Sequence, residues 1–190
     1  MTIAYEAMLF AKKAHEGQKR KYTGNPYFDH CCEVAGIVST VASGATVGGS
    51  NGAGGGCASS AGSDMIATAF LHDVMEDCDV RYDDVRRRFG GTIAYGVFML
   101  SDLEEGNRKQ RKEKSRARVS SARGWVQTIK CADLISNTSS IIEHDPKFAG
   151  VYLQEKASLL DVMTRADVRL LTIAHQQVQD GLMKINGPVV

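Results

Sequence analysis

The sequence predicts an all-α protein folded as a single domain over residues 1–190. Apolar residues recur at three- and four-residue intervals along most of the chain, which is the period of amphipathic helices. No segment alternates apolar and polar residues for long enough to indicate a β-strand. Because 43% of the residues are hydrophobic, a chain of this length favours one well-buried core over two full domains. We therefore expect a helical bundle interrupted by two long loops.

Helices are expected wherever this period is sustained. In the first of them Ile3, Phe10 and Ala14 share a face, and Gly17 or Gly24 should end the helix. A later helix can be capped by a side-chain oxygen of Ser63 or Asp64. In order, helices are expected over residues 3–18, from near Asp29, from Ser63 or Asp64 into the sequence LHDVMED, and over 83–89, 93–100, 125–142, 152–163 and 171–182.

Two long segments lack a helical period. Residues 44–63 are mostly Gly, Ser and Ala, which bury too little apolar surface to offset the entropy of ordering them. Residues 104–123 are polar and strongly basic. Both are predicted to be loops, and residues 185–190 are predicted to be a frayed tail.

Composition narrows the classes of function. The 23 basic and 22 acidic residues nearly cancel, so a net charge of +1 does not favour binding to nucleic acid or to an anionic membrane. The N-terminus lacks the apolar run of a secretory signal, and no stretch is apolar for long enough to span a bilayer. The five cysteines lack CxxC spacing, as expected of reduced thiols. A cytoplasmic protein is expected.

The sequence LHDVMED, residues 71–77, is the densest group of chemically competent side chains. On a continuous helix His72 and Glu76 are four residues apart, as are Asp73 and Asp77, so all four would project from one side. The preceding run ATAFL is apolar, which indicates that this turn enters the core. Carboxylates crowded there repel one another unless a cation neutralises them. The segment alone fits either a divalent-metal site or a solvated acidic helix end.

Two other segments could complete a metal site. His30 follows the turn TGNPYFD, and Asp133 lies in IKCADLISN, where Lys130, Asp133 and Asn137 share a helix face. Taken singly, a histidine is more often packed or solvated, and an aspartate more often lies on the surface. The case for a site therefore depends on the three segments acting together.

Together these segments resemble a known family. His30, His72-Asp73 and Asp133 follow the H…HD…D pattern of HD-domain metal phosphohydrolases. In order and spacing, AKKAHEGQKRKYTGNPYFDH, LHDVMED, RRRFGG and IKCADLISN resemble the ppGpp-hydrolase domain of the RelA/SpoT family. The chain is too short for the synthetase and regulatory domains of the long enzymes, so it resembles the stand-alone small alarmone hydrolases of the MESH type. The resemblance implies an HD-domain helical bundle.

The resemblance also implies a metal centre and a catalytic pair. His30, His72, Asp73 and Asp133 would hold one divalent ion, typically Mn²⁺ in this family, although residue type also allows Zn²⁺ or Fe²⁺. Glu76 and Asp77 match the acidic pair that handles the protons of the attacking water. The pattern does not divide the two tasks between them.

Residues for substrate binding follow from the same resemblance. Arg20 and Lys21 match a pair that packs on the nucleobase and reaches phosphate, and a guanidinium plane can stack on a purine. In the basic segment, Arg111 and Lys112 are candidates for contacts to the phosphates. The remaining candidates, for base, ribose or pocket contacts, are Thr23, Lys130, Asn137 and Tyr152.

The expected function is hydrolysis of ppGpp or pppGpp to GDP or GTP and pyrophosphate, which would lower the signal of the stringent response. The same centre could act instead on an adenine alarmone such as ppApp, or on the 2′-phosphate of NADPH. A different class is a non-catalytic nucleotide sensor or an antitoxin-like partner. The expected partner is a small nucleotide, with no nucleic acid or membrane, and the protein is expected to be a monomer or a homodimer.

Overall fold

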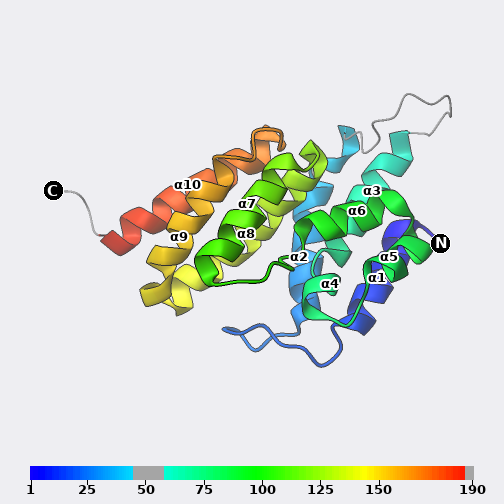
Figure 1. Cartoon of the computed structure of the whole chain (residues 1–190), viewed down its shortest axis with the longest axis horizontal. Coiled ribbons are helices and arrows are strands. Elements are labelled where there is room, and N and C mark those ends of the chain that lie inside the picture. The colour runs from blue at the N-terminus through cyan, green and yellow to red at the C-terminus, as the bar shows by residue number, and fades with distance from the viewer. Residues whose placement is uncertain (45–57, 187–190) are drawn as a thin grey trace. The chain divides into compact units, whose positions relative to one another are not determined.

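The regular secondary structure of the protein is helical. The computed structural model describes residues 1–44 and 58–186, and apart from one isolated β-bridge between Lys19 and Pro26, the regular elements of this part of the chain are helices (Figure 1). This confirms the predicted all-α class. The chain forms two compact units, Met1–Leu103 and Glu104–Val190. The single-domain organisation over residues 1–190 stays a prediction.

The first unit is built around a long core helix, α3, against which α1, α2 and α6 pack. Its helices are α1 (Ile3–Ala14), α2 (Tyr27–Ser39), the 3₁₀ turn η1 (Ala42–Gly44), α3 (Ala58–Leu71), α4 (Val74–Asp77), α5 (Tyr82–Phe89) and α6 (Gly91–Leu100). Ala7 and Ala11 on α1 allow the close approach to α3, since their side chains are small and fully buried. The core of this unit is a cluster of buried apolar residues, Ala7, Ala11, Ala67, Leu71, Val74, Val85, Phe89, Ile93, Ala94 and Val97.

The predicted Gly-rich loop over residues 44–63 is only partly described. Residues 45–57 lie outside the described part of the chain. Helix α3 begins at Ala58, not at Ser63 or Asp64 as predicted. The small residues before Asp64 therefore extend the helix, and the predicted loop is wrong for that stretch, because alanine and serine tolerate helical geometry well.

The prediction of one continuous helix through LHDVMED is wrong. Helix α3 ends at Leu71, His72 and Asp73 form a turn, and the short helix α4 starts at Val74. Side chains of adjacent residues on a regular helix do not face each other, whereas His72 Nε2 and Asp73 Oδ2 lie 2.8 Å apart. The break is what lets these two neighbours approach. The prediction that this segment enters the core is confirmed, since His72, Asp73 and Val74 are all buried.

In the second unit three long helices lie side by side, with α10 packed on both α8 and α9 (Figure 1). The helices of this unit are α7 (Arg108–Ser121), α8 (Gly124–His144), α9 (Pro146–Leu160) and α10 (Val168–Asn186). Helix α10 reaches Asn186, so the predicted tail begins later than residue 185, and residues 187–190 lie outside the described part of the chain. The buried apolar residues include Trp125, Val126, Ile129, Leu134, Leu153, Leu160, Met163, Ala174 and Val178.

The predicted basic loop over residues 104–123 is largely a helix, α7. It starts with a reciprocal cap: the side chain of Asn107 accepts from Gln110 N at 3.0 Å, and that of Gln110 accepts from Asn107 N at 3.1 Å. Arginine, lysine and glutamine also favour helices intrinsically, so a strong apolar period was not needed. Val119 is fully buried, and Arg118 pairs with Glu104, which fixes α7 on its own unit.

Within the described residues, no helix combines the length and the apolar character that crossing a bilayer requires.

Two glycines of the second unit should respond in opposite ways to alanine. At Gly124 an added Cβ would lie 2.3 Å from the backbone oxygen of Arg165, so we expect Gly124→Ala to lower the free energy of unfolding by about 1–3 kcal/mol. At Gly150, inside α9, a Cβ would meet no atom within 4 Å, so Gly150→Ala should raise it by about 0.5–1 kcal/mol. Urea unfolding of the two variants measures both changes. Equal effects of the two substitutions would contradict the packing described at Gly124.

Candidate metal centre

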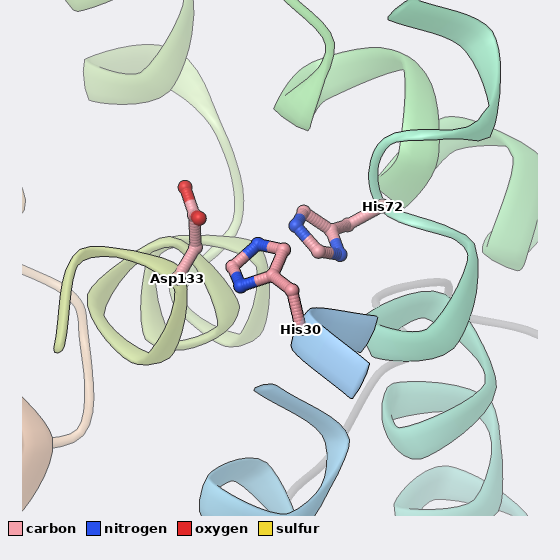
Figure 2. A group of neighbouring side chains, drawn as sticks. All are labelled: His30, His72 and Asp133. Atoms are coloured by element: carbon pink, nitrogen blue, oxygen red, sulfur yellow. The ribbon is translucent and has the colours of Figure 1, made fainter. Parts of the chain in front are cut away.

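Two histidines meet a carboxylate in the first unit. His30 lies on α2 and His72 directly follows α3, and both side chains are buried. Figure 2 shows their imidazole rings facing each other, with ring centroids 5.1 Å apart in an edge-to-face arrangement. Asp73 Oδ2 lies 2.8 Å from His72 Nε2 and 3.6 Å from His30 Nε2. One carboxylate oxygen is thus shared by two imidazole nitrogens.

The end of α3 sets the tautomer of His72. Its Nδ1 lies 2.8 Å from the backbone oxygen of Ala69, one of the last carbonyls of a helix, which lack partners inside the helix. A carbonyl can only accept, so Nδ1 carries the proton and donates. A neutral His72 therefore turns the lone pair of Nε2 toward Asp73 Oδ2. Two such electron-rich atoms at 2.8 Å require a positive charge between them, either a proton or a metal ion.

The carboxylate of Asp73 is also held from a third side. Tyr27, the first residue of α2, donates its hydroxyl to Asp73 Oδ2 at 2.6 Å. The tyrosine ring lies edge-on to His30, with centroids 5.5 Å apart. Tyr27 was not among the predicted site residues. The signal available in the sequence was its place one helical turn before His30.

The predicted catalytic pair lies on α4, just beyond this cluster. Glu76 and Asp77 are both exposed, and the carboxylate of Glu76 accepts a hydrogen bond of 2.7 Å from the backbone N–H of Asp102. At Asp77, desolvation and the nearby negative charge of Asp73 raise the pKa of the carboxyl above its ordinary value, while the nearby hydroxyl of Tyr27 opposes the rise.

Asp133 is a buried residue of α8 in the second unit. Lys130 Nζ lies 2.9 Å from Asp133 Oδ2, and Asn137 Nδ2 donates to Asp133 Oδ1 at 2.7 Å. The helix face that the sequence predicted for these three residues is thus confirmed by side-chain contacts. Asparagine and lysine on either side fix the orientation of a carboxylate that would be costly to bury alone.

The donor set suits a divalent metal ion. His30, His72 and Asp73 are buried in the first unit and offer two imidazole nitrogens and a carboxylate, and Asp133 is a buried carboxylate of the second unit. Imidazole and carboxylate ligands together fit Mn²⁺, Fe²⁺ or Zn²⁺. The hydrogen bond from His72 to Ala69 is the kind of outer contact that orients a metal-binding histidine. By the chemistry of its donors, the site fits the ion that the sequence predicted.

Cys31, which follows His30, is not in the group of described donor side chains that lie close enough together to hold one ion. It is fully buried, and desolvation together with the charge of Asp73 raises the pKa of its thiol well above the ordinary value. Among the described residues, Cys31, Cys32, Cys78 and Cys131 are free cysteines, and Cys57 lies outside the described part of the chain.

The predicted base-binding residues Arg20, Lys21 and Thr23 lie together on the turn between α1 and α2. The turn is closed by Arg20 N donating to Asn25 O at 2.8 Å. Arg20 pairs with Glu33 at 3.3 Å, the ammonium of Lys21 lies over the ring of Tyr22, and Thr23 accepts a hydrogen bond from Asn25 N. The structure thus brings these three predicted residues to one loop of the first unit.

The remaining predicted substrate residues belong to the second unit. Arg111 is exposed on α7, and Lys112 is half-buried beside it. Tyr152 is 7% exposed on α9, with the ammonium of Lys156 4.9 Å from the centre of its ring. A buried tyrosine is consistent with a packing role as well as with a pocket wall.

Comparison with known proteins identifies the family. A model of the HD domain matches residues 7–130, so the chain belongs to the HD-domain family. Within that family its domain is of the RelA/SpoT hydrolase type. It is 32% identical over 57% of its length to a guanosine-3′,5′-bis(diphosphate) 3′-pyrophosphohydrolase of Vibrio cholerae, and the match covers 13% of that protein. It is 26% identical to the pyrophosphohydrolase MESH1 of Drosophila melanogaster, over 74% of this chain and 70% of that one.

A solved structure shares the fold over nearly the whole chain. The structure of a metazoan ortholog of SpoT that hydrolyses ppGpp superposes with a TM-score of 0.79, covering 96% of this chain and 97% of that one at 22% identity. The first curated relatives are much longer, since the matches span only 12% of their length. The predicted HD-domain helical bundle and the predicted relation to small alarmone hydrolases are therefore confirmed.

Metal binding should be visible as added stability. A ligand that binds only the folded state stabilises it by about 2.7 kcal/mol at one hundred times its Kd. We expect Mn²⁺ to raise the melting temperature of metal-stripped protein, and His30→Ala to remove that shift because it deletes a buried side chain that is predicted to bind the ion. His144→Ala, at an exposed histidine of α8, is the matched control and should keep the shift. Equal shifts in the two variants would contradict a metal centre at His30.

Proposed function

We propose that this protein is a metal-dependent phosphohydrolase that removes the 3′-pyrophosphate from ppGpp or pppGpp. The observation that carries the proposal is the convergence of His30 Nε2 and His72 Nε2 on one oxygen of Asp73, inside a buried part of an HD domain. Buried carboxylates next to imidazole lone pairs are costly unless a cation is bound. Two relatives, from Vibrio cholerae and Drosophila melanogaster, carry the name of this activity, which favours it over other phosphohydrolase reactions.

In this proposal four side chains hold one ion. His30, His72 and Asp73 come from the first unit, and Asp133 from α8 supplies the fourth ligand by the H…HD…D pattern. Mn²⁺ is the proposed ion because two imidazoles and two carboxylates suit it. When bound, such an ion acts as a Lewis acid on the phosphate and lowers the pKa of water.

Glu76 and Asp77 are proposed to move the protons. Water forms a bond to the phosphorus next to the ribose, the bond from that phosphorus to the 3′-oxygen breaks, and the 3′-oxygen takes up a proton as pyrophosphate leaves. One carboxylate is needed to accept a proton from the water and one carboxyl to deliver a proton to the 3′-oxygen. Glu76 is oriented by the backbone N–H of Asp102, and burial and the charge of Asp73 raise the pKa of Asp77.

Substrate recognition is assigned to the cationic turn and to residues of the second unit. Arg20 and Lys21 are proposed to contact the base and the phosphates, with Thr23 shaping the turn. Arg20 now pairs with Glu33, so contact with a ligand would replace this ion pair. The other proposed contacts are made by Lys130, Asn137, Tyr152, Arg111 and Lys112.

A substrate panel tests the proposed function directly. Purified protein loaded with Mn²⁺ is incubated with ppGpp, pppGpp, ppApp and NADPH, and the release of pyrophosphate or phosphate is measured for each. We expect pyrophosphate and GDP from ppGpp at a rate above that for the other base and for NADPH. No turnover of any of the four with Mn²⁺, Zn²⁺ or Fe²⁺ would refute a hydrolase.

The paired carboxylates should be needed for turnover but not for metal binding. Glu76→Gln combined with Asp77→Asn removes the groups that exchange protons, and we expect the rate on ppGpp to fall by at least about 100-fold. Because neither residue is a proposed ligand, the Mn²⁺-induced shift in melting temperature should remain. Asp79→Asn, at an exposed neighbouring aspartate, is the control and should keep its activity. A double variant as active as that control would assign the chemistry to other groups.

A further inference from the structure

Tyr27 is fixed at the start of α2 by contacts on several sides. It follows Pro26, and its backbone N–H donates to the oxygen of Gln18 at 2.9 Å. Its ring stacks on that of His15 with centroids 4.8 Å apart and an interplanar angle of 28°, and it meets the ring of His30 edge-on. His15 is itself only 2% exposed. The tyrosine ring therefore has little freedom to turn.

The hydroxyl of Tyr27 points at the oxygen that the two histidines share. It donates to Asp73 Oδ2 at 2.6 Å, and the same oxygen is the one nearest to His72 Nε2 and His30 Nε2. A carboxylate oxygen accepts more than one hydrogen bond, so this donor leaves other lone-pair directions of Asp73 available.

His15, on which the ring of Tyr27 stacks, is connected to the segment of Asp73 and Asp77 by hydrogen bonds through Gln18. Gln18 Nε2 donates to the backbone oxygen of Asp77 at 2.9 Å, which leaves Gln18 Oε1 to accept from His15 Nδ1 at 2.8 Å. The ring on which Tyr27 stacks is therefore tied to the segment that carries Asp73 and Asp77. Contacts of this kind give a fixed position that a flexible surface tyrosine would not have.

We propose that Tyr27 is a positioning residue for the metal centre, and that its hydroxyl holds the Asp73 carboxylate in the orientation that binds the ion together with His30 and His72. This inference rests on the proposed function, since it requires that the cluster binds a metal. Outer contacts that orient a ligand are typically worth about 10- to 100-fold in metal affinity. The residue acts through Asp73 and does not itself bind the ion.

The test compares metal affinity in matched variants. Tyr27→Phe keeps the ring that stacks on His15 and removes only the hydroxyl, and Tyr5→Phe, at an exposed tyrosine of α1, is the control. Affinity for Mn²⁺ is measured by titration with detection of free Mn²⁺ by electron paramagnetic resonance, at a temperature where circular dichroism shows every variant folded. We expect Tyr27→Phe to bind about 10- to 100-fold more weakly and Tyr5→Phe to bind like the unaltered protein.

Two further measurements separate positioning from a purely structural role. In an Asp73→Asn background, Tyr27→Phe should cause no further loss of affinity, because the two residues act through one contact. An amino group in place of the hydroxyl, introduced as p-aminophenylalanine at position 27, keeps a donor and should restore most of the affinity. This variant also keeps the proposal testable if Tyr27→Phe does not fold.

The outcomes are distinguishable. If the unaltered protein does not bind Mn²⁺, the proposed function fails and the role of Tyr27 fails with it. If the unaltered protein binds Mn²⁺ and Tyr27→Phe binds it equally well, only the role of Tyr27 is overturned. A full additional loss in the Asp73→Asn background, or no rescue by the amino group, would likewise overturn it.

Discussion

The contact between two imidazole nitrogens and one carboxylate oxygen is the constraint on which the site depends. His30, His72 and Asp73 are buried together, and lone pairs that face each other in a core are unfavourable unless a positive charge joins them. The surrounding structure accommodates this arrangement through specific hydrogen bonds. The backbone oxygen of Ala69, in the last turn of α3, accepts a hydrogen bond from Nδ1 of His72, and the hydroxyl of Tyr27 donates one to Asp73. Both contacts orient the donors toward a common point.

The break between α3 and α4 makes this contact possible. On an uninterrupted helix, neighbouring residues point about 100° apart, and their side chains cannot share a ligand. With the helix ended at Leu71, His72 can bond to the carbonyl of Ala69 while Asp73 turns toward it. The chain is therefore not helical at His72 and Asp73, the two residues whose side chains form this contact. Val74, which follows them, is fully buried in the core of the first unit.

Each of the two units holds one proposed carboxylate ligand through its own neighbours. Asp73 receives a hydroxyl from Tyr27, and Asp133 receives an amide from Asn137 and an ammonium from Lys130. These partners are donors, which stabilise the charged form of a carboxylate. The charged side chains of α7 are arranged differently, since most are exposed and Arg118 pairs within its unit. The two carboxylates are buried, whereas the more numerous basic residues are mostly exposed. The larger cost of removing charge from water therefore falls on the carboxylates.

The sequence by itself determined the class of fold, the order of most helices and the four motifs that contain the donors, because apolar period and residue spacing are local properties. Predictions from the sequence were wrong where the structure depends on contacts of side chains at the ends of helices. The hydrogen bond between Asn107 and Gln110 stabilises the start of α7, which the sequence predicted to be a loop. The side chain of His72 bonds to the backbone oxygen of Ala69 where α3 ends, within a segment predicted to be one continuous helix. Spacing places Tyr27 one helical turn before His30, but its role comes from stacking on His15 and from reaching Asp73, 46 residues away in the chain. Only tertiary structure decides such contacts, because they join segments whose distance in sequence carries no periodic signal.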